Sequence, residues 1–289
     1  MIVTKLMGGL GNQMFQYAAA IGASHINEIP YVDLSMYQMN GHEDTSRGFE
    51  LGQLTTKYKI LSRDKKIDLC SSKSYWLRHF FSENAFLNIE EKFFQFESSV
   101  LKHKDKNLYL SGYWQSYKYF EHVRKRLIED FTPSGEISPE NSELITQILS
   151  CESVAVHVRR GDYITNSNAN SYHGVMPISY YVEALKILKL KKQNLKIFYF
   201  SDDPFWIQDN LVNVVGEGTI ISHNNGTNSF WDMILMSYCK HFILANSSFS
   251  WWGAWLAQNS AKIVVAPQKW FTNAEINTSD LIPPEWLRL

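Results

Sequence analysis

The second half of the chain alternates short apolar runs with helical patterns, and this order limits the possible folds more than any other feature of the sequence. Apolar, β-branched or aromatic runs occupy residues 153–159, 195–200, 219–222, 241–245 and 262–266, and helical patterns lie between them at 177–192, 205–210, 230–239 and 248–259. Strands and helices in such alternation form βαβ units, in which helices cover both faces of a parallel sheet. We therefore predict an α/β fold with a mostly parallel sheet in this half.

The first half begins in the same way and then becomes less regular. A strand pattern at residues 1–6 leads into a glycine-rich turn at 8–11 and a helical pattern from 13 to about 23. Residues 40–108 are polar and aromatic without a sustained period, which is typical of long loops or short helices. Prolines and a glycine between 132 and 139 mark a boundary. We predict two domains, 1–148 and 149–289, with about the last 15 residues packing back on the first domain.

The charges of the chain are nearly balanced, with 28 basic and 29 acidic residues. Such a chain has no general attraction for nucleic acid or an anionic membrane, so any anion must be bound locally. The 3 cysteines lie far apart, without a C-x-x-C pair, which favours a reducing compartment and argues against structural zinc. No stretch is apolar over the roughly 20 residues that a transmembrane helix needs. We expect a cytoplasmic protein, with peripheral attachment to the inner membrane left open.

Polar side chains lie at the carboxyl ends of three of the strands predicted in the second half. They are His157, Arg159, Arg160 and Asp162 at the end of the first, Ser201, Asp202 and Asp203 at the end of the next, and residues 246–250 (NSSFS) after another. Open α/β sheets bind ligands outside the carboxyl ends of their strands. Arginine, serine hydroxyls and helix N-terminal amides bind phosphate, and a carboxylate can accept hydrogen bonds from guanine. The combination predicts a site for a nucleoside diphosphate.

Each of these residues also has a purely structural interpretation. His157 stands among alternating valines and could be a core histidine. Arg159 and Arg160 point to opposite faces if both lie in the strand, so one of them could merely pair with a surface acid. The aspartates at 202–203 and the serines at 247–248 are also typical helix caps. Their position at successive strand ends favours the ligand site.

The glycine-rich run at 8–13 (GGLGNQ) follows a strand and opens a helix, so it resembles a phosphate-binding turn. It fits neither well-known type, because Met14 replaces the third glycine of a dinucleotide fingerprint and no Lys-Ser or Lys-Thr of a P-loop follows. We expect these glycines to allow close approach of the backbone to a bulky group. The sequence also lacks an aspartate-x-aspartate pair, which holds the metal in many nucleotide-sugar transferases. We therefore predict no metal ion, and expect arginine and backbone amides to stabilise a departing diphosphate.

Five stretches of the chain, in order, resemble a known enzyme family. Residues 156–163 (VHVRRGDY) resemble the H-x-R-R-x-D motif shared by α1,2-, α1,6- and protein O-fucosyltransferases. Residues 8–18 (GGLGNQMFQYA) and 246–256 (NSSFSWWGAWL) are similar more narrowly to the α1,2-fucosyltransferases, glycosyltransferase family 11. Residues 112–116 (GYWQS) and 200–204 (FSDDP) fit the same family.

The resemblance implies a GT-B-like fold, with two Rossmann-type domains and a cleft between them. The second domain would bind most of the donor, and the first would form the acceptor side of the cleft. It implies a galactoside α1,2-fucosyltransferase, which transfers L-fucose from GDP-β-L-fucose to the 2-hydroxyl of a terminal galactose. The reaction would invert the anomeric centre and use no metal or other cofactor. The acceptor would be a galactose-terminated oligosaccharide or glycolipid, linked β1,3 or β1,4, and no nucleic acid is implied.

The resemblance also assigns roles to residues. Arg159 would hold the β-phosphate and His157 the guanosine, with Asp202 or Asp203 at the guanine edge. Arg159, Asn12 and Asp162 are the implied catalytic residues, Asn12 facing the donor and Asp162 bracing the arginines. The implied donor-binding residues are Gly9, Gly11, Asn12, His157, Arg159, Asp202, Asp203, Asn246, Ser247, Ser248, Phe249 and Ser250.

A general base for the acceptor hydroxyl stays unassigned. Asp162, His42, Glu43 and Asp44 are candidates, and each could equally be a solvated loop residue. Residues 113–115 (YWQ) could contact the acceptor, because aromatic rings pack on sugar faces, or they could be core.

Three other functions remain open. The first is a protein O-fucosyltransferase-like enzyme, and the second is a non-catalytic glycan- or nucleotide-binding module. The third is a nicotinamide-dependent dehydrogenase, which a failure to bind NAD would exclude.

Overall fold

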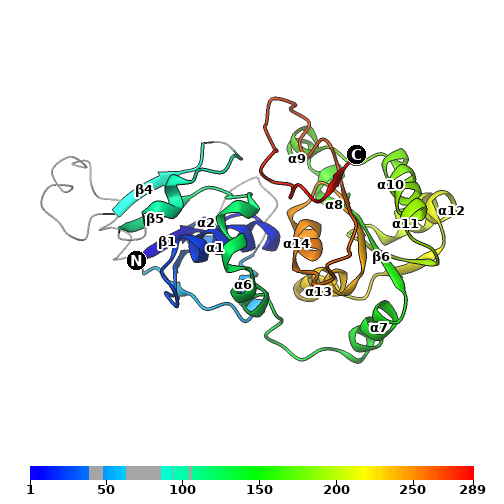
Figure 1. Cartoon of the computed structure of the whole chain (residues 1–289), viewed down its shortest axis with the longest axis horizontal. Helices are drawn as coiled ribbons and strands as arrows, with labels where there is room; N and C mark the ends of the chain where they lie inside the picture. The colour runs from blue at the N-terminus through cyan, green and yellow to red at the C-terminus, as the bar shows by residue number, and fades with distance from the viewer. Residues whose placement is uncertain (39–47, 63–85, 93, 104–105) are drawn as a thin grey trace, which may run out of the picture. The chain divides into compact units, whose positions relative to one another are not determined.

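The computed structural model describes residues 1–38, 48–62, 86–92, 94–103 and 106–289. They form two compact units, Met1–Thr132 with Asn277–Leu281, and Pro133–Ile276 with Ile282–Leu289. Each unit contains one parallel sheet with helices beside it, which confirms the α/β class (Figure 1). Helix α7 (Pro139–Leu149) belongs to the second unit, although the predicted division at 148 placed it in the first.

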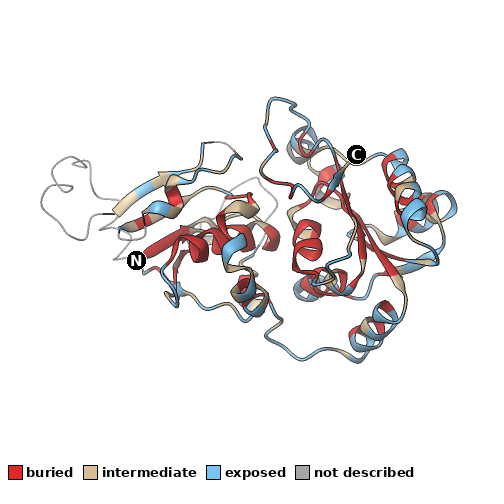
Figure 2. Ribbon diagram, in the orientation of Figure 1, coloured by how far each residue is buried: buried red, intermediate tan, exposed pale blue. Residues whose placement is uncertain are grey.

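The first unit is built on a sheet whose strands lie in the order β3-β2-β1-β5-β4. The strands are β1 (Ile2–Lys5), β2 (Tyr31–Asp33), β3 (Lys59–Ile60), β4 (Phe86–Glu90) and β5 (Asn107–Ser111). The helices are α1 (Leu10–Ala23), α2 (Ser35–Gln38), α5 (Ser99–Lys102) and α6 (Arg124–Asp130), with 3-10 turns at Leu51–Gln53, Tyr117–Tyr119 and Glu121–Val123. Helix α1 is buried along nearly its whole length (Figure 2), and it follows β1 as the strand–turn–helix pattern predicted.

The second unit contains a sheet in the order β11-β10-β9-β6-β7-β8. The strands are β6 (Glu152–Val158), β7 (Leu195–Ser201), β8 (Gly218–Ile221), β9 (His241–Ile243), β10 (Val264–Ala266) and β11 (Leu287–Arg288). Besides α7, the helices are α8 (Gly161–Thr165), α9 (Ser167–His173), α10 (Ile178–Lys191), α11 (Pro204–Asn210), α12 (Val212–Val215), α13 (Phe230–Tyr238) and α14 (Ser248–Leu256), with a 3-10 turn at Gly226–Asn228. The strands and helices predicted in this half are all present within a few residues of their expected bounds.

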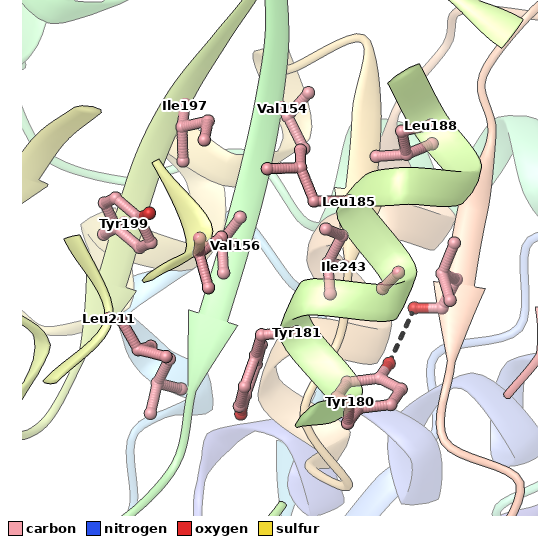
Figure 3. Packing of buried hydrophobic residues seen from close by; sticks show 14 of the residues in the cluster. Val154, Val156, Tyr180, Tyr181, Leu185, Leu188, Ile197, Tyr199, Leu211 and Ile243 are labelled. Carbon is pink, nitrogen blue, oxygen red and sulfur yellow. Dashed lines mark hydrogen bonds between the residues drawn. The ribbon is translucent and has the colours of Figure 1, made fainter. Parts of the chain in front are cut away.

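Helices cover both faces of the second sheet, with α10 and α11 on one side of β6 and α13 and α14 on the other (Figure 1). On the α10 side, Tyr181 and Leu185 join a buried cluster with Val154 and Val156 (Figure 3). Successive side chains of a strand point to opposite faces, so His157 lies on the other face, where its ring contacts Phe249 of α14. The alternation in β6 thus separates the core from the polar site.

Candidate functional site

The order of the second sheet reverses at β6, because β7 and β8 lie on one side of it and β9 on the other. Ligands of open α/β sheets bind at such a switch point, outside the carboxyl ends of the strands. His157 and Arg159 stand at the carboxyl end of β6, and Asn246 to Ser248 follow β9. The structure therefore brings two of the three predicted polar groups to the switch point itself, with the third on the adjacent strand β7.

Asp202, after β7, holds the end of β6 in place. Its Oδ2 lies 2.9 Å from Nη1 of Arg159, and its Oδ1 accepts a hydrogen bond of 2.9 Å from the backbone N–H of Arg160. A Cβ at Gly161 would lie 2.7 Å from the same Oδ2, so only glycine leaves room for the carboxylate there. Asp202 therefore orients Arg159, a role different from the guanine contact implied by the resemblance.

Arg160 and Asp203 form a separate group. The Arg160 guanidinium lies 4.0 Å from the centre of the Trp206 ring, and its Nε is 3.3 Å from Oδ2 of Asp203. The other oxygen of Asp203 accepts from the backbone N–H of Trp206 at 3.1 Å and caps α11. Asp203 therefore acts as a helix cap, and each of the two arginines pairs with one of the two aspartates that follow β7.

His157 is a buried, neutral imidazole beside this arginine. Burial lowers its pKa to about 3; Asp202 opposes this shift and the Arg159 charge adds to it. The ring centre lies 5.8 Å from that of Phe249. The Nδ1 atom is buried and has no hydrogen-bond partner among the described residues. A buried polar atom of this kind can bond to a ligand.

Residues 246–250 include buried side chains that bond within the protein and half-buried side chains that a ligand can contact. Asn246 is buried, and its Nδ2 donates to the backbone oxygens of His173 (2.7 Å) and Trp270 (3.2 Å). Ser250 is also buried and donates to the backbone oxygen of Ser247 at 3.2 Å, so neither side chain offers a donor to a ligand.

Ser247 caps α14, since its side chain accepts from the N–H of Phe249. Ser248 and Phe249 are half-buried and lie at the positive N-terminal end of the helix. Within residues 246–250, these two are therefore the residues whose side chains remain accessible to a bound sugar nucleotide.

The start of α1, where a donor contact is predicted for Gly9 and Gly11, holds a carboxylate of this chain. The carboxylate of Glu50 accepts a hydrogen bond of 3.0 Å from the backbone N–H of Leu10, in the first turn of α1. Its negative charge occupies the helix end that would attract phosphate. The half-buried side chain of Asn12 instead accepts from Gln115 at 2.8 Å.

The candidate general bases lie at positions whose side chains are outside the described residues. Asp162 lies in α8, but its side chain is outside the described residues. The candidate bases His42, Glu43 and Asp44 also lie outside them.

Asp232, in the first turn of α13, is a candidate site residue that sequence reasoning missed. Burial raises its pKa to about 7, although a 2.8 Å hydrogen bond from Nδ2 of Asn224 opposes the shift. Asn224 is in turn paired with Asn141 by two 3.0 Å hydrogen bonds. Because α13 follows β8, its N-terminal end lies at the same sheet edge as Arg159. The available signal was a single acid within an apolar helical run, FWDMIL.

Among the described residues, no group of three or more His, Cys, Asp or Glu side chains is arranged to hold a metal ion. Within the same residues, no helix combines the length and apolar character needed to cross a membrane.

The parallel sheets and a switch point lined by arginine, imidazole and a helix N-terminus are typical of α/β glycosyltransferases. The model of Glycosyl transferase family 11 matches residues 1–289, and the chain belongs to this family.

Relatives of the chain include enzymes with named sugar donors. An alpha-1,2-colitosyltransferase of Escherichia coli is 34% identical and covers 100% of this chain and 98% of its own length. The O-antigen biosynthesis glycosyltransferase WbnK of Escherichia coli is 35% identical over 98% of this chain and 99% of its own. Galactoside alpha-(1,2)-fucosyltransferase 1 of Homo sapiens is 26% identical over 53% of this chain and 44% of its own.

Solved structures agree on the fold. The fucosyltransferase NodZ from Bradyrhizobium superposes with a TM-score of 0.52 at 14% identity, covering 88% of this chain and 90% of that one. The fold is therefore GT-B-like.

Proposed function

We propose that the chain is a galactoside α1,2-fucosyltransferase, which transfers L-fucose from GDP-β-L-fucose to the 2-hydroxyl of a terminal galactose. One observation carries the donor half of the proposal. Arg159 stands at the switch point of the second sheet, oriented by Asp202 and next to the neutral His157. This arrangement suits a diphosphate, because the guanidinium supplies charge while the imidazole adds none.

The proposed reaction is a single displacement with inversion, from a β-linked donor to an α-linked product. The acceptor oxygen forms the new bond to C1 of fucose while the bond from C1 to the β-phosphate oxygen breaks. GDP leaves with that electron pair, and the hydroxyl proton passes to a base that we do not assign. Arg159 and the N-terminal end of α14 at Ser248 stabilise the departing charge, so no metal ion is needed.

Guanine recognition is better assigned to Asp232 than to the pair at 202–203. Asp202 is engaged by both arginines, and Asp203 caps α11. Asp232 accepts one hydrogen bond from Asn224 and makes no ion pair among the described residues. The N1–H and amino group of guanine would stabilise its ionised form, which burial alone disfavours.

A second donor deserves equal testing, because the relative that is 34% identical over the whole chain is named a colitosyltransferase. Colitose is L-fucose without its 3-hydroxyl, so both donors carry the same leaving group and the same configuration at C1. The switch-point residues serve either sugar, and a contact to the 3-hydroxyl would decide between them.

The test is acceptor-dependent release of GDP in the presence of EDTA. GDP-fucose and GDP-colitose are compared as donors, with lactose and N-acetyllactosamine as acceptors. The variants are Arg159→Ala and, as the matched control, Arg160→Ala, which removes the neighbouring charge that lies on Trp206. Removal of a preorganised donor of this kind costs about 3 kcal/mol of transition-state stabilisation, or about a hundredfold in kcat.

We expect release that survives EDTA, falls by about this factor in Arg159→Ala and is largely retained in Arg160→Ala. Transfer from GDP-colitose alone would replace the fucosyl assignment with the colitosyl one. No release with either galactoside, but release with a folded protein domain added as a third acceptor, would favour a protein O-fucosyltransferase-like enzyme. GDP binding without turnover of either donor would favour a non-catalytic binding module.

A further inference from the structure

The first sheet has a switch point of its own, between β1 and β5. Its order β3-β2-β1-β5-β4 places β2 and β3 on one side of β1 and β5 and β4 on the other. The segments that follow these two strands meet there, since Nε2 of Gln115 donates to Oδ1 of Asn12 at 2.8 Å. Gly8, with a φ of 75°, leaves space for Asn12, because a Cβ there would lie 2.6 Å from its Nδ2. The side-chain pair is therefore held at the position where such sheets bind ligands.

Glu91, just after β4, clamps the turn that carries Gln115. One of its oxygens, Oε2, accepts from the backbone N–H groups of Tyr113 at 2.6 Å and Trp114 at 3.0 Å. Gly112 permits this approach, since a Cβ there would lie 2.3 Å from Cβ of Glu91. Trp114 has a φ of 55°, in the left-handed region that a bulky residue rarely adopts. Strain of this kind persists where surrounding contacts hold it and is concentrated at functional sites.

The same turn contains several buried polar atoms without partners. Among the described residues, no hydrogen bond reaches Nε1 of Trp114, Oε1 of Gln115 or Oγ of Ser116. The three side chains are 1%, 6% and 1% exposed. Native proteins satisfy most buried polar atoms, so a group of unsatisfied ones in one turn indicates a ligand with both donors and acceptors.

The charge around this switch point disfavours a diphosphate. Glu50 occupies the N-terminal end of α1, and Glu91 lies on the other side, after β4. Two carboxylates repel phosphate but accept hydrogen bonds from a neutral sugar. Tyr113 is 37% exposed as a whole residue, and its ring stacks on Phe94, with ring centres 6.2 Å apart and planes 18° apart. Such an aromatic surface suits the C–H face of a pyranose.

We propose that the Tyr113–Ser116 turn, together with Asn12, forms the subsite for the neutral acceptor sugar, and that Glu91 is a positioning residue that holds the turn in its binding conformation. The inference rests on the proposed function, in which this sugar is a β-galactoside. Tyr113 packs on its apolar face, and Asn12 and Gln115 bond to its hydroxyls. Donor binding stays with the second unit.

The experiment measures KM for lactose at saturating donor and KM for the donor at saturating lactose. Glu91→Ala removes the clamp, whereas Glu91→Gln keeps an oxygen that can accept both backbone hydrogen bonds. Glu90→Ala removes an adjacent exposed carboxylate and serves as the control. Tyr113→Ala and Tyr113→Phe test the ring without touching the clamp, in case Glu91→Ala does not fold.

We expect Glu91→Ala and Tyr113→Ala to raise KM for lactose by about tenfold, which corresponds to the loss of one hydrogen bond or one ring contact. KM for the donor should stay within about twofold of the parent value. Glu91→Gln, Tyr113→Phe and Glu90→Ala should stay near the parent values. A rise in both KM values, a rise for the donor alone, or an unchanged KM for lactose in Tyr113→Ala would overturn the subsite. If the parent chain transfers to no galactoside, the proposed function fails first, before any variant is compared.

Discussion

At the scale of single residues, the position of Arg159 depends on the absence of a Cβ atom at Gly161. A Cβ at Gly161 would lie 2.7 Å from Oδ2 of Asp202, the oxygen that binds Arg159. We predict that Gly161→Ala displaces this carboxylate and lowers kcat by about tenfold or more, because small misplacements of a catalytic group cost large factors. Steady-state kinetics test this, with Gly135→Ala as control, since a Cβ there meets nothing within 4 Å. Equal rates for both variants would contradict the proposed role of Asp202.

The chemistry of individual residues could be predicted from the sequence only where their partners lie close along the chain or on neighbouring strands. The group at the ends of β6 and β7 was predicted because the parallel sheet brings those ends together. Glu50 was missed at the start of α1 because it comes 40 positions after Leu10, from an irregular segment. Glu91 was missed for the same reason, because its backbone contacts lie 22 and 23 positions away.

At the scale of secondary-structure elements, α13 carries a carboxyl group whose ionisation opposes folding. Burial raises the pKa of Asp232 from its ordinary value of 3.8 to about 7. At pH values between these two, Asp232 has lost its proton in the unfolded chain but keeps it in the folded chain. The free energy of unfolding should therefore fall as pH rises through this window. Between about pH 6 and pH 8 we predict a loss of about 1 kcal/mol that is absent in Asp232→Asn.

Urea unfolding at both pH values measures this difference. Asp209→Asn, which removes an exposed carboxylate from α11, is the control for the loss of one charge. The same pH dependence in Asp232→Asn and the parent chain would show that Asp232 is ionised in the folded protein throughout this range.

The elements themselves were predicted unevenly, for physical reasons. Buried parallel strands such as β6 and β7 are continuous apolar runs, which the sequence displays clearly. Strand β11 has only two residues, and β4 carries exposed polar side chains at Asn88 and Glu90, so neither has a periodic signal. Their pairing with neighbouring strands decides their conformation.

At the scale of the whole molecule, each unit presents one switch point with a distinct chemical character. The second sheet offers Arg159 and a helix N-terminus, which suit a diphosphate. The first offers carboxylates, amides and an aromatic ring, which suit a neutral sugar. The two proposals therefore assign the donor to the second unit and the acceptor sugar to the first. The motifs identified the family, but the charge at the first switch point emerged only from the structure.

The central claim is tested most directly by the structure of the product. The chain is incubated with GDP-fucose and lactose, and the purified trisaccharide is analysed by NMR for the configuration and position of the new linkage. The account predicts an α-linked fucose on the 2-hydroxyl of galactose, as a single inverting displacement from the β-linked donor requires. A β-linked product, a linkage to another hydroxyl, or hydrolysis of the donor without transfer would contradict it.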